Sequence, residues 1–273
     1  MSSSSASHGI TDLHSHLVPG VDDGAVTIED TLEGIGRMVA RGVRTIVTTP
    51  HVRGSLAHQP EALEDRLGEL REAFERTLPV VLEAWPDLDF RLGCEVMLDR
   101  PDLDLSHPGL GLGGASVLLV EWPGLQVPPE TPAVLESLRG QGLQVMIAHP
   151  ERYHGFQPGL AVVPRWREEG AFLQMNHGSL LGRFGPEVRE RAFRFLAHGW
   201  VDCLASDFHG RPTLRLYMAE AHAVFEEGGA LDAWTLLTEA NPARILAGDP
   251  PLPVPPLAIG RGFMRRLLAR IRP

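Results

Sequence analysis

Residues 10–16 read ITDLHSH, a short apolar and β-branched start that finishes in two histidines. This composition predicts a β-strand. Side chains alternate between the two faces of a strand, so His14 and His16 would lie on the same side. The loop that follows, residues 21–24, reads VDDG and brings two carboxylates, Asp22 and Asp23, close in the sequence to these imidazoles. The segment therefore predicts a strand that carries possible metal ligands at its carboxyl end.

The same pattern of an apolar strand followed by a helix repeats along the chain. Strands are predicted over residues 10–16, 43–49, 88–96, 116–122, 143–148, 171–176 and 201–206. Helices are predicted over residues 28–40, 61–78, 131–139, 160–169, 186–198, 214–227 and 231–239. Several strands are almost continuously apolar, which is typical of parallel strands covered on both faces. About seven strand–helix units favour an α/β barrel of the TIM type in a single domain, with an open doubly wound sheet as the alternative.

Composition and charge exclude several classes of protein. The 273 residues include 25 basic and 35 acidic ones, for a net charge of −10, and every basic residue is arginine. The lack of lysine excludes Schiff-base catalysis, a phosphate-loop lysine and a carbamylated-lysine metal bridge. The acidic balance argues against binding of duplex nucleic acid. No apolar run approaches the roughly 20 residues of a membrane helix, and two cysteines form no disulfide framework, so we expect a cytoplasmic location.

The two ends of the chain differ from its centre. Residues 1–8 form a serine-rich leader that we expect to be disordered, residues 9–248 form one domain, and residues 249–259 are a proline-rich linker. Residues 260–273 alternate apolar residues with arginines at helical spacing and include five arginines within 261–272. This basic amphipathic helix is expected either to contact an anionic membrane surface or an acidic partner, or to fold back onto the acidic body.

Metal-capable side chains recur at the carboxyl ends of the predicted strands, which meet on one face of a parallel barrel. One histidine at such a position is usually structural, but five histidines and four carboxylates at matching positions indicate a metal centre. Imidazoles and carboxylates suit manganese, iron or zinc, and nine ligands are enough for two or three ions. The candidates are His14, His16, Asp23 (with Asp22 as its rival), His51, Glu95, Glu121, His149, Asp207 and His209.

These motifs give the chain a recognisable family resemblance. The quoted segments are DLHSH (12–16), VDDG (21–24), GVRTIV (42–47), TPH (49–51), AHPER (148–152), ASDFH (205–209), GRP (210–212) and NPARI (241–245). Over about residues 10–245 the chain resembles the PHP (polymerase and histidinol phosphatase) superfamily. Within it, the chain resembles the CpsB-type tyrosine-protein phosphatases of bacterial capsule and exopolysaccharide systems. The VDDG and AHPER segments narrow the resemblance to this branch.

The resemblance implies a distorted (β/α)7 barrel that holds three divalent or transition-metal ions, with manganese first and iron or zinc as alternatives. The first ion would be held by His14, His16, Glu95 and Asp207, the second by Glu95, Glu121 and His149, and the third by Asp23, His51 and His209. Arg152 and Arg211 match arginines that the family uses at the phosphate, which makes them the expected catalytic and substrate-binding residues.

The implied activity is metal-dependent hydrolysis of protein phosphotyrosine, on the tail of a bacterial tyrosine kinase that controls polysaccharide export. Water bound to such metals has a pKa near 7, so hydroxide is available at neutral pH. A metal-bound water or His177 is a candidate general acid. Two alternatives remain: a phosphoesterase that acts on a small molecule such as histidinol phosphate, and a non-catalytic metal-binding regulator of export.

Two further patterns receive structural interpretations. Residues 94–100 match the C-x5-R spacing of cysteine-dependent tyrosine phosphatases, but Glu95 and Asp99 inside the loop would repel phosphate, and no glycine is present. We therefore interpret the match as coincidence. Trp122, Tyr153 and Phe156 lie near the predicted strand ends and are expected to pack in the core rather than to form walls of the site.

Overall fold

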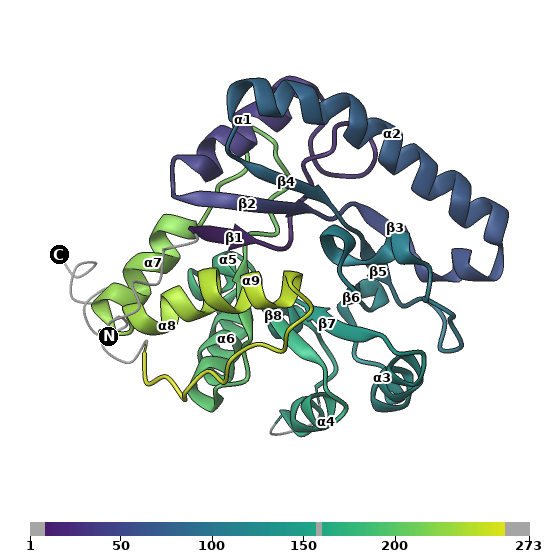
Figure 1. The fold of residues 1–273 in the computed structure, drawn as a ribbon. Helices are drawn as coiled ribbons and strands as arrows, with labels where there is room; N and C mark the ends of the chain where they lie inside the picture. Colours follow the sequence, from purple (N-terminus) through teal and green to yellow (C-terminus); the bar gives the residue numbers. More distant parts are fainter. Residues whose placement is uncertain (1–8, 157–159, 260–273) are drawn as a thin grey trace, which may run out of the picture.

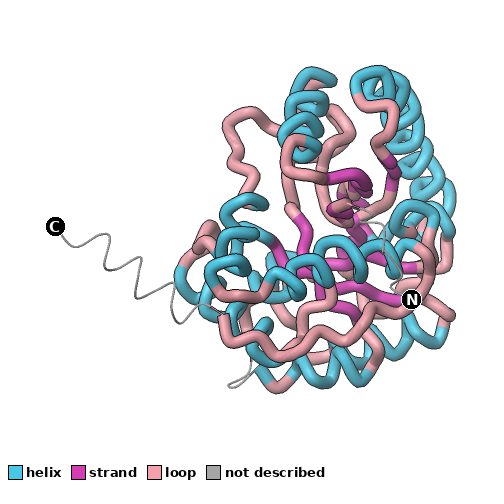
Figure 2. The backbone as a smooth tube through the Cα atoms, turned by 60° about the vertical axis from the view of Figure 1, so that its left-hand side comes forward, coloured by secondary structure: helices cyan, strands magenta, loops and turns pink. Residues whose placement is uncertain are grey.

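The computed structural model describes residues 9–156 and 160–259 (Figure 1). The predicted leader, residues 1–8, and the predicted basic tail helix, residues 260–273, lie outside the described residues. Strands occupy the centre of the molecule and helices surround them, as the tube view also shows (Figure 2). No helix in the two described ranges is both long and apolar enough to cross a membrane.

The strands of the described chain pair in parallel and form two sheets. One sheet has the order β1-β2-β4 and the other the order β3-β5-β6-β7-β8-β9. Their bounds are β1 (Ile10–Asp12), β2 (Val43–Thr48), β3 (His51–Arg53), β4 (Asp89–Leu92), β5 (Glu95–Met97), β6 (Val117–Glu121), β7 (Gln144–Ala148), β8 (Phe172–Asn176) and β9 (Cys203–Ala205). The predicted α/β class with parallel strands is confirmed.

The strand predicted over residues 88–96 is divided into β4 and β5, and the strand predicted over residues 43–49 is followed by β3, which was not predicted. These two breaks separate the sheets. β2 and β3 flank Thr49 and Pro50, and β4 and β5 flank Gly93 and Cys94. Proline has no N–H to donate to a ladder, so pairing breaks there. Hydrogen bonds still cross the break, because the N–H of Gly93 donates to the carbonyl of Thr48 and that of Glu95 to the carbonyl of Pro50. Each sheet therefore continues into the other, and the strand segments correspond to the seven predicted units.

The first and last strands meet through the residues that follow them. The Asp207 N–H donates to the His14 carbonyl at 2.9 Å, and the His16 N–H donates to the Phe208 carbonyl at 2.9 Å. Ser15 and Phe208 form a parallel bridge. These contacts join β9 to β1, so the strands follow one another around a distorted barrel, as the family resemblance implies.

Helices α1 to α6 lie between strands in the sequence, and α7 to α9 follow the last strand. Their bounds are α1 (Ile28–Val39), α2 (Pro60–Ala84), α3 (Thr131–Gly140), α4 (Val162–Glu168), α5 (His177–Leu180), α6 (Pro186–His198), α7 (Met218–Glu227), α8 (Leu231–Thr235) and α9 (Asn241–Leu246). Thr27 caps α1 in a reciprocal pair with Asp30. The prediction is wrong for α5, which it omitted, and for α7, which begins at Met218 rather than at residue 214. The carbonyl of Leu214 is held outside that helix by the guanidinium of Arg37.

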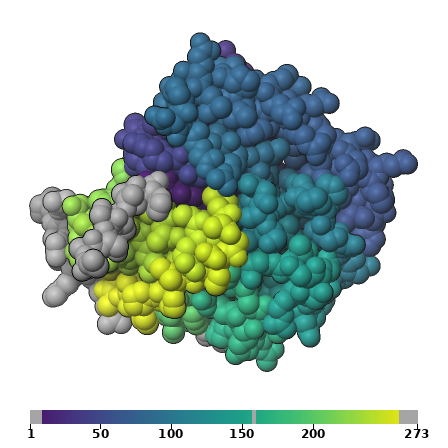
Figure 3. All heavy atoms as spheres, viewed as in Figure 1, coloured from purple at the N-terminus to yellow at the C-terminus, as the bar shows by residue number. Residues whose placement is uncertain are grey.

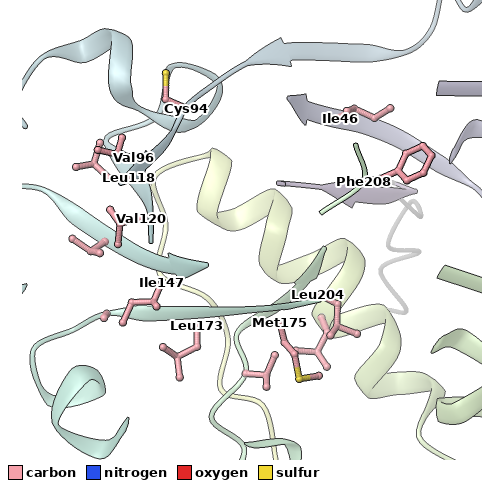
Figure 4. Packing of buried hydrophobic residues seen from close by; sticks show 14 of the residues in the cluster. Ile46, Cys94, Val96, Leu118, Val120, Ile147, Leu173, Met175, Leu204 and Phe208 are labelled. Atoms are coloured by element: carbon pink, nitrogen blue, oxygen red, sulfur yellow. The ribbon is translucent and has the colours of Figure 1, made fainter. Parts of the chain in front are cut away.

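Both faces of the strands are buried. One cluster of apolar side chains, including Val96, Leu118, Val120, Ile147 and Leu173, belongs to the larger core that the strands share with the helices (Figure 4). The alternate residues of the same strands form a second, smaller cluster that includes Val117, Leu119 and Met146. This alternation explains the almost continuously apolar strands in the sequence. Because the interior is filled by side chains, the polar residues are left at the strand ends.

The proline-rich residues 249–259 contain no helix or strand and lie along the body of the protein (yellow in Figure 3). The Leu252 N–H donates to the Asn241 side chain at 2.7 Å, and the Leu257 N–H donates to the Leu196 carbonyl at 2.9 Å. Val254 and Ile259 are buried. These contacts anchor the segment to the barrel.

Candidate metal centre

The nine candidate ligands meet at the carboxyl ends of the strands. Eight of them follow, begin or end a strand: His14 and His16 follow β1, His51 begins β3, Glu95 begins β5, Glu121 ends β6, His149 follows β7, and Asp207 and His209 follow β9. Their donor atoms fall into four overlapping groups whose members lie within 4.8 Å of one another. Asp23 joins one of these groups from the VDDG loop. The chain therefore brings together every residue of the predicted set, and we call this set the ligand cluster.

Glu95 lies at the centre of the ligand cluster and is 1 % exposed. One of its oxygens, Oε2, is 3.1 Å from His14 Nε2, 3.4 Å from His16 Nε2 and 3.3 Å from His51 Nδ1. The other, Oε1, is 3.1 Å from His149 Nε2. One carboxylate thus faces four imidazoles with both oxygens, an arrangement that suits a bridging ligand between metal ions.

The two neighbouring aspartates of the VDDG loop have different positions. The Asp23 carboxylate lies 3.4 Å from His51 Nε2 and 3.4 Å from His209 Nε2. The Asp22 carboxylate lies 2.8 Å from His16 Nδ1 and accepts the His51 N–H. Asp22 therefore orients the ring of His16 from behind, whereas Asp23 faces the ligand cluster. This geometry favours Asp23 over Asp22 as the ligand.

His149 and Asp207 have left-handed backbone conformations, with φ of 34° and 48°. Few residues other than glycine adopt this region, and aspartate and histidine do so several-fold more often than most. Both residues come soon after a strand ends, where the turn directs their side chains into the ligand cluster.

The electrostatics of the ligand cluster favour a bound cation. Burial alone would lower the pKa of His14, but the charges of Glu95 and Asp207 outweigh it and raise that pKa to about 9. Burial and the charge of Glu95 raise the pKa of Glu121 to about 8. The carboxylates thus create a strongly negative potential that stabilises positive charge among the rings.

The donor atoms also fit metal ions chemically. His14 Nε2 and His16 Nε2 are 3.3 Å apart, so their lone pairs repel each other unless a proton or a cation lies between them. The neighbouring donors are imidazole nitrogens and carboxylate oxygens, the ligand types that manganese, iron and zinc share. The residues present therefore fit the ions that the resemblance implies.

A chain of buried amides connects two of the ligands from behind. Gln174 Oε1 lies 2.9 Å from His14 Nδ1, and Gln174 Nε2 donates to Asn176 Oδ1 at 2.9 Å. Asn176 Nδ2 in turn donates to Asp207 Oδ2 at 2.7 Å. Both amides come from β8, a strand that contributes no candidate ligand. Sequence analysis missed these two residues, although their alternation on one strand, followed by a histidine, is a visible signal.

The backbone N–H of His149 fixes which atom of the Gln174 side-chain amide accepts hydrogen bonds. The His149 N–H is an obligatory donor, and it donates to Gln174 Oε1 at 3.3 Å. Because Oε1 only accepts, His14 Nδ1 must carry the proton, which leaves the Nε2 lone pair of His14 free for a metal ion. The amide chain also occupies Oδ2 of Asp207, so that Oδ1 faces the ligand cluster. Such outer contacts orient metal ligands and tune their affinity.

We expect Gln174→Leu to lower metal affinity by roughly tenfold to a hundredfold, because loss of such an outer contact has that effect in other metal sites. The substitution leaves His14 Nδ1 and the His149 N–H without their shared acceptor. Titration of the metal-free protein with Mn²⁺ measures the change. Gln144→Leu is the matched control, since Gln144 lies on the neighbouring strand β7 and bonds the Gly170 carbonyl at the surface. Equal affinities of the two variants would contradict the orienting role.

The two predicted arginines lie at the edge of the ligand cluster. Arg152 Nη1 donates to Asp207 Oδ2 at 2.7 Å, and Arg152 Nε is buried with no hydrogen-bond partner among the described residues. Arg211 is exposed, and it donates to the carbonyls of Gly24 and Asp23 at 3.1 and 2.9 Å. Arg152 therefore has one unpaired donor, Nε, beside the ligand cluster, and Arg211 holds the loop that carries the two aspartates.

His177 occupies a different environment from the one a general acid needs. Its ring packs against Trp234, with the ring centroids 5.6 Å apart, and neither ring nitrogen has a hydrogen-bond partner within the described part of the chain. Burial lowers the pKa of His177 to about 3. A neutral imidazole is too weak an acid to protonate a leaving group near pH 7, so the structure does not support the suggested role.

The buried His177 has a consequence for stability. Its pKa is about 3 in the folded chain and about 6.5 when exposed on unfolding, so the unfolded state binds more protons below pH 6.5. The resulting loss of stability between pH 7 and pH 5 is about 2 kcal/mol. We expect His177→Leu to remove this loss, as measured by urea unfolding of both proteins at each pH. The same substitution at exposed His58 should preserve the wild-type pH dependence, and parallel curves for wild type and His177→Leu would contradict the assignment.

The other sequence interpretations can be compared with the structure. Cys94 is buried, and burial raises the pKa of its thiol to about 12, so it is no nucleophile at neutral pH and the C-x5-R match is a coincidence. Trp122 and Tyr153 are buried in the core with their rings edge to face, and the backbone N–H of Trp122 donates to the Tyr153 hydroxyl. The expectation of core packing is confirmed for these two residues.

Comparison with known proteins adds independent findings. Residues 10–247 match the family model for CpsB/CapC proteins of capsular polysaccharide synthesis. The chain is 29% identical over 249 residues to the tyrosine-protein phosphatase YwqE of Bacillus subtilis, covering 89% of this chain and 96% of the relative. It is 28% identical over 243 residues to the tyrosine-protein phosphatase CpsB of Streptococcus pneumoniae, covering 86% of this chain and 97% of that one.

A solved structure supports the same relationship. It belongs to work on YwqE from Bacillus subtilis and CpsB from Streptococcus pneumoniae, described as unique metal-dependent tyrosine phosphatases. The match has a TM-score of 0.73 and 26% sequence identity, and it covers 92% of this chain and 100% of the other. The similarity therefore includes the whole barrel and the face that carries the ligand cluster.

Proposed function

The chain belongs to the CpsB/CapC family of capsular polysaccharide synthesis proteins, and from this membership we propose that it is a metal-dependent phosphomonoesterase that hydrolyses phosphotyrosine in proteins. The observation that carries the proposal is the meeting of imidazoles and carboxylates around Glu95, with the unpaired Nε donor of Arg152 at the edge. A scaffold protein would have no need of such a donor beside a metal site.

We assign the ligands of three metal ions from the family pattern and the four groups of donor atoms. The first ion would be held by His14, His16, Glu95 and Asp207, the second by Glu95, Glu121 and His149, and the third by Asp23, His51 and His209. One group of donor atoms joins His16 to the third set, and another contains His14, His16 and Asp207 without Glu95. Glu95 lies with His14 and His149 in one group and with His51 and Glu121 in the other. Manganese is the first choice of metal, with iron and zinc as alternatives that share the same donor types.

The chemistry divides between the ions and the protein. When bound, the metal ions lower the pKa of water and polarise the phosphoryl oxygens. The protein orients the ligands through Asp22, Gln174 and Asn176 and presents the planar donors of Arg152 to the phosphoryl group. A tyrosine leaving group has a pKa of about 10 and departs more easily than an alkoxide. The reaction therefore depends less on a general acid, in keeping with the neutral, buried state of His177.

The natural substrate that we propose is the tyrosine-rich tail of a bacterial tyrosine kinase in polysaccharide export. Relatives in this family carry names that connect tyrosine phosphatase activity with capsule synthesis. A kinase of this kind would place the reaction in the cytoplasm near the inner face of the membrane. The basic segment 261–272, which we expect to contact an anionic or acidic partner, lies outside the described residues.

The proposal is tested by phosphate release from a phosphotyrosine peptide, a phosphoserine peptide and histidinol phosphate. Each is measured with added Mn²⁺, with a chelator, and with the variant His149→Ala. Turnover of phosphotyrosine that disappears with chelator and in the variant is the expected result. Turnover of histidinol phosphate alone would keep the metal centre and overturn the substrate. Metal binding without any turnover would favour a non-catalytic regulator.

A further inference from the structure

Arginine and aromatic side chains alternate along a line that begins at the ligand cluster. The guanidinium carbon of Arg152 lies 4.2 Å from the ring centroid of Phe184, and that of Arg183 lies 5.3 Å from the same ring. Arg183 also lies 5.6 Å from the ring centroid of Tyr217, and Arg215 lies 5.3 Å from that ring. We call these five side chains the arginine–aromatic ladder. Each distance is within the range of a cation–π contact.

The ladder is continuous with the site. Its first member, Arg152, donates to Asp207 in the ligand cluster. The other four members line one hollow together with Asp207 and His209. They come from the residues that follow α5 and from the segment between β9 and α7, both of which lie beyond the carboxyl ends of barrel strands. The ladder therefore borders the ligand cluster, and a peptide whose phosphate reaches the cluster would pass over the ladder residues.

One cation of the ladder has no carboxylate partner among the described residues. Arg152 pairs with Asp207, and Arg215 pairs with Glu220. Arg183 is exposed and, within the described residues, contacts rings but no carboxylate. Both rings lie within cation–π distance of its guanidinium, whose planar fork suits hydrogen bonds to an anion. In a chain with a net charge of −10, an exposed cation held in this way beside the site points to an anionic ligand.

We propose that the arginine–aromatic ladder is a second binding site for the substrate, and that Arg183 binds an anionic group close to the phosphotyrosine that is hydrolysed. The group is a carboxylate or a second phosphate on a flanking residue, because both accept hydrogen bonds from the edge of a guanidinium. This inference rests on the proposed function, and it adds a preference for acidic or multiply phosphorylated peptides. The preference is electrostatic and decreases with salt.

The test compares kcat/KM for peptides that share one phosphotyrosine and differ in one neighbour. One pair of peptides compares glutamate with glutamine, and the other compares a second phosphotyrosine with phenylalanine. In each pair the varied residue is placed first before and then after the phosphotyrosine that is hydrolysed. We expect wild type to prefer the anionic member of at least one pair by about fivefold at low salt, since an exposed ion pair has at most about that effect. A response to both kinds of anion identifies a general anion site, and a response to the second phosphate alone identifies a phosphate site.

Arg183→Gln should reduce that preference to about one, and Arg183→Lys should recover part of it. Tyr217→Leu should also weaken the preference, because it removes one of the two rings that hold the guanidinium. Arg76→Gln is the matched control, since Arg76 is an exposed arginine on α2 outside the ladder. Its distance to Glu72 is 3.9 Å, so the change breaks no close ion pair. Equal turnover of all peptides by wild type would overturn the proposal that the ladder binds substrate, and it would leave the proposed function intact. A failure to hydrolyse any phosphotyrosine peptide would overturn both.

Discussion

Glu95→Gln is expected to lower phosphotyrosine hydrolysis by about 10³-fold, or roughly 4 kcal/mol in activation free energy, because metal ions held at such a site supply several kcal/mol of transition-state stabilisation. The substitution preserves the shape of the side chain and removes one negative charge. That charge faces His14, His16, His51 and His149 at 3.1 to 3.4 Å. Because the family pattern also makes Glu95 the shared ligand of two ions, the metal content should fall together with activity.

Two measurements separate this result from simple misfolding. Circular dichroism of the variant should match that of wild type, and metal analysis after dialysis should show fewer bound ions per chain. Glu64→Gln is the matched control, because Glu64 also pairs with an imidazole, His107 at 2.8 Å, but at the surface. If Glu95→Gln retains its metal ions and most of its turnover, the ligand cluster is not the catalytic metal centre.

The sequence predicted the strands well because they are buried on both faces. Their apolar, β-branched runs are bounded by polar turns, and each of the seven predicted ranges contains strand residues. The interruptions at Pro50 and Gly93 were not predicted, since hydrophobicity does not register where ladder pairing breaks. The helix ends were less certain for a related reason: the start of α7 depends on the tertiary contact between Arg37 and the Leu214 carbonyl.

The candidate ligands were predictable because they lie at the ends of strands and match a family pattern. The residues that orient them were not. Asp22 and Asp23 are adjacent and chemically identical, and only their contacts with His16 on one side and with His51 and His209 on the other distinguish them. The arginine–aromatic ladder joins residues 152, 183, 184, 215 and 217, whose spacing in the sequence follows no helical or strand period.

Arg152→Ala is expected to lower kcat/KM for a phosphotyrosine peptide by about 10²-fold to 10³-fold, the effect of removing one donor from developing negative charge in a transition state. Arg152 Nε is buried and has no hydrogen-bond partner among the described residues, and the guanidinium lies beside Asp207 at the edge of the ligand cluster. Arg152→Lys keeps the charge but loses the planar fork and the contact with Phe184, so it should recover only part of the loss.

The alternative explanation for such a loss is that Arg152 only positions Asp207, to which it donates at 2.7 Å. Measurement of metal affinity distinguishes this positioning role from direct binding of the phosphoryl group. Asp207 keeps its hydrogen bond from Asn176 at 2.7 Å in the variant, so metal affinity should change little if Arg152 acts on the substrate. A loss of metal affinity in proportion to the loss of turnover would instead assign Arg152 to the support of Asp207. Because Arg152 also begins the arginine–aromatic ladder, its substitution should lower kcat/KM for acidic and neutral peptides alike, whereas substitution of Arg183 should remove the difference between them.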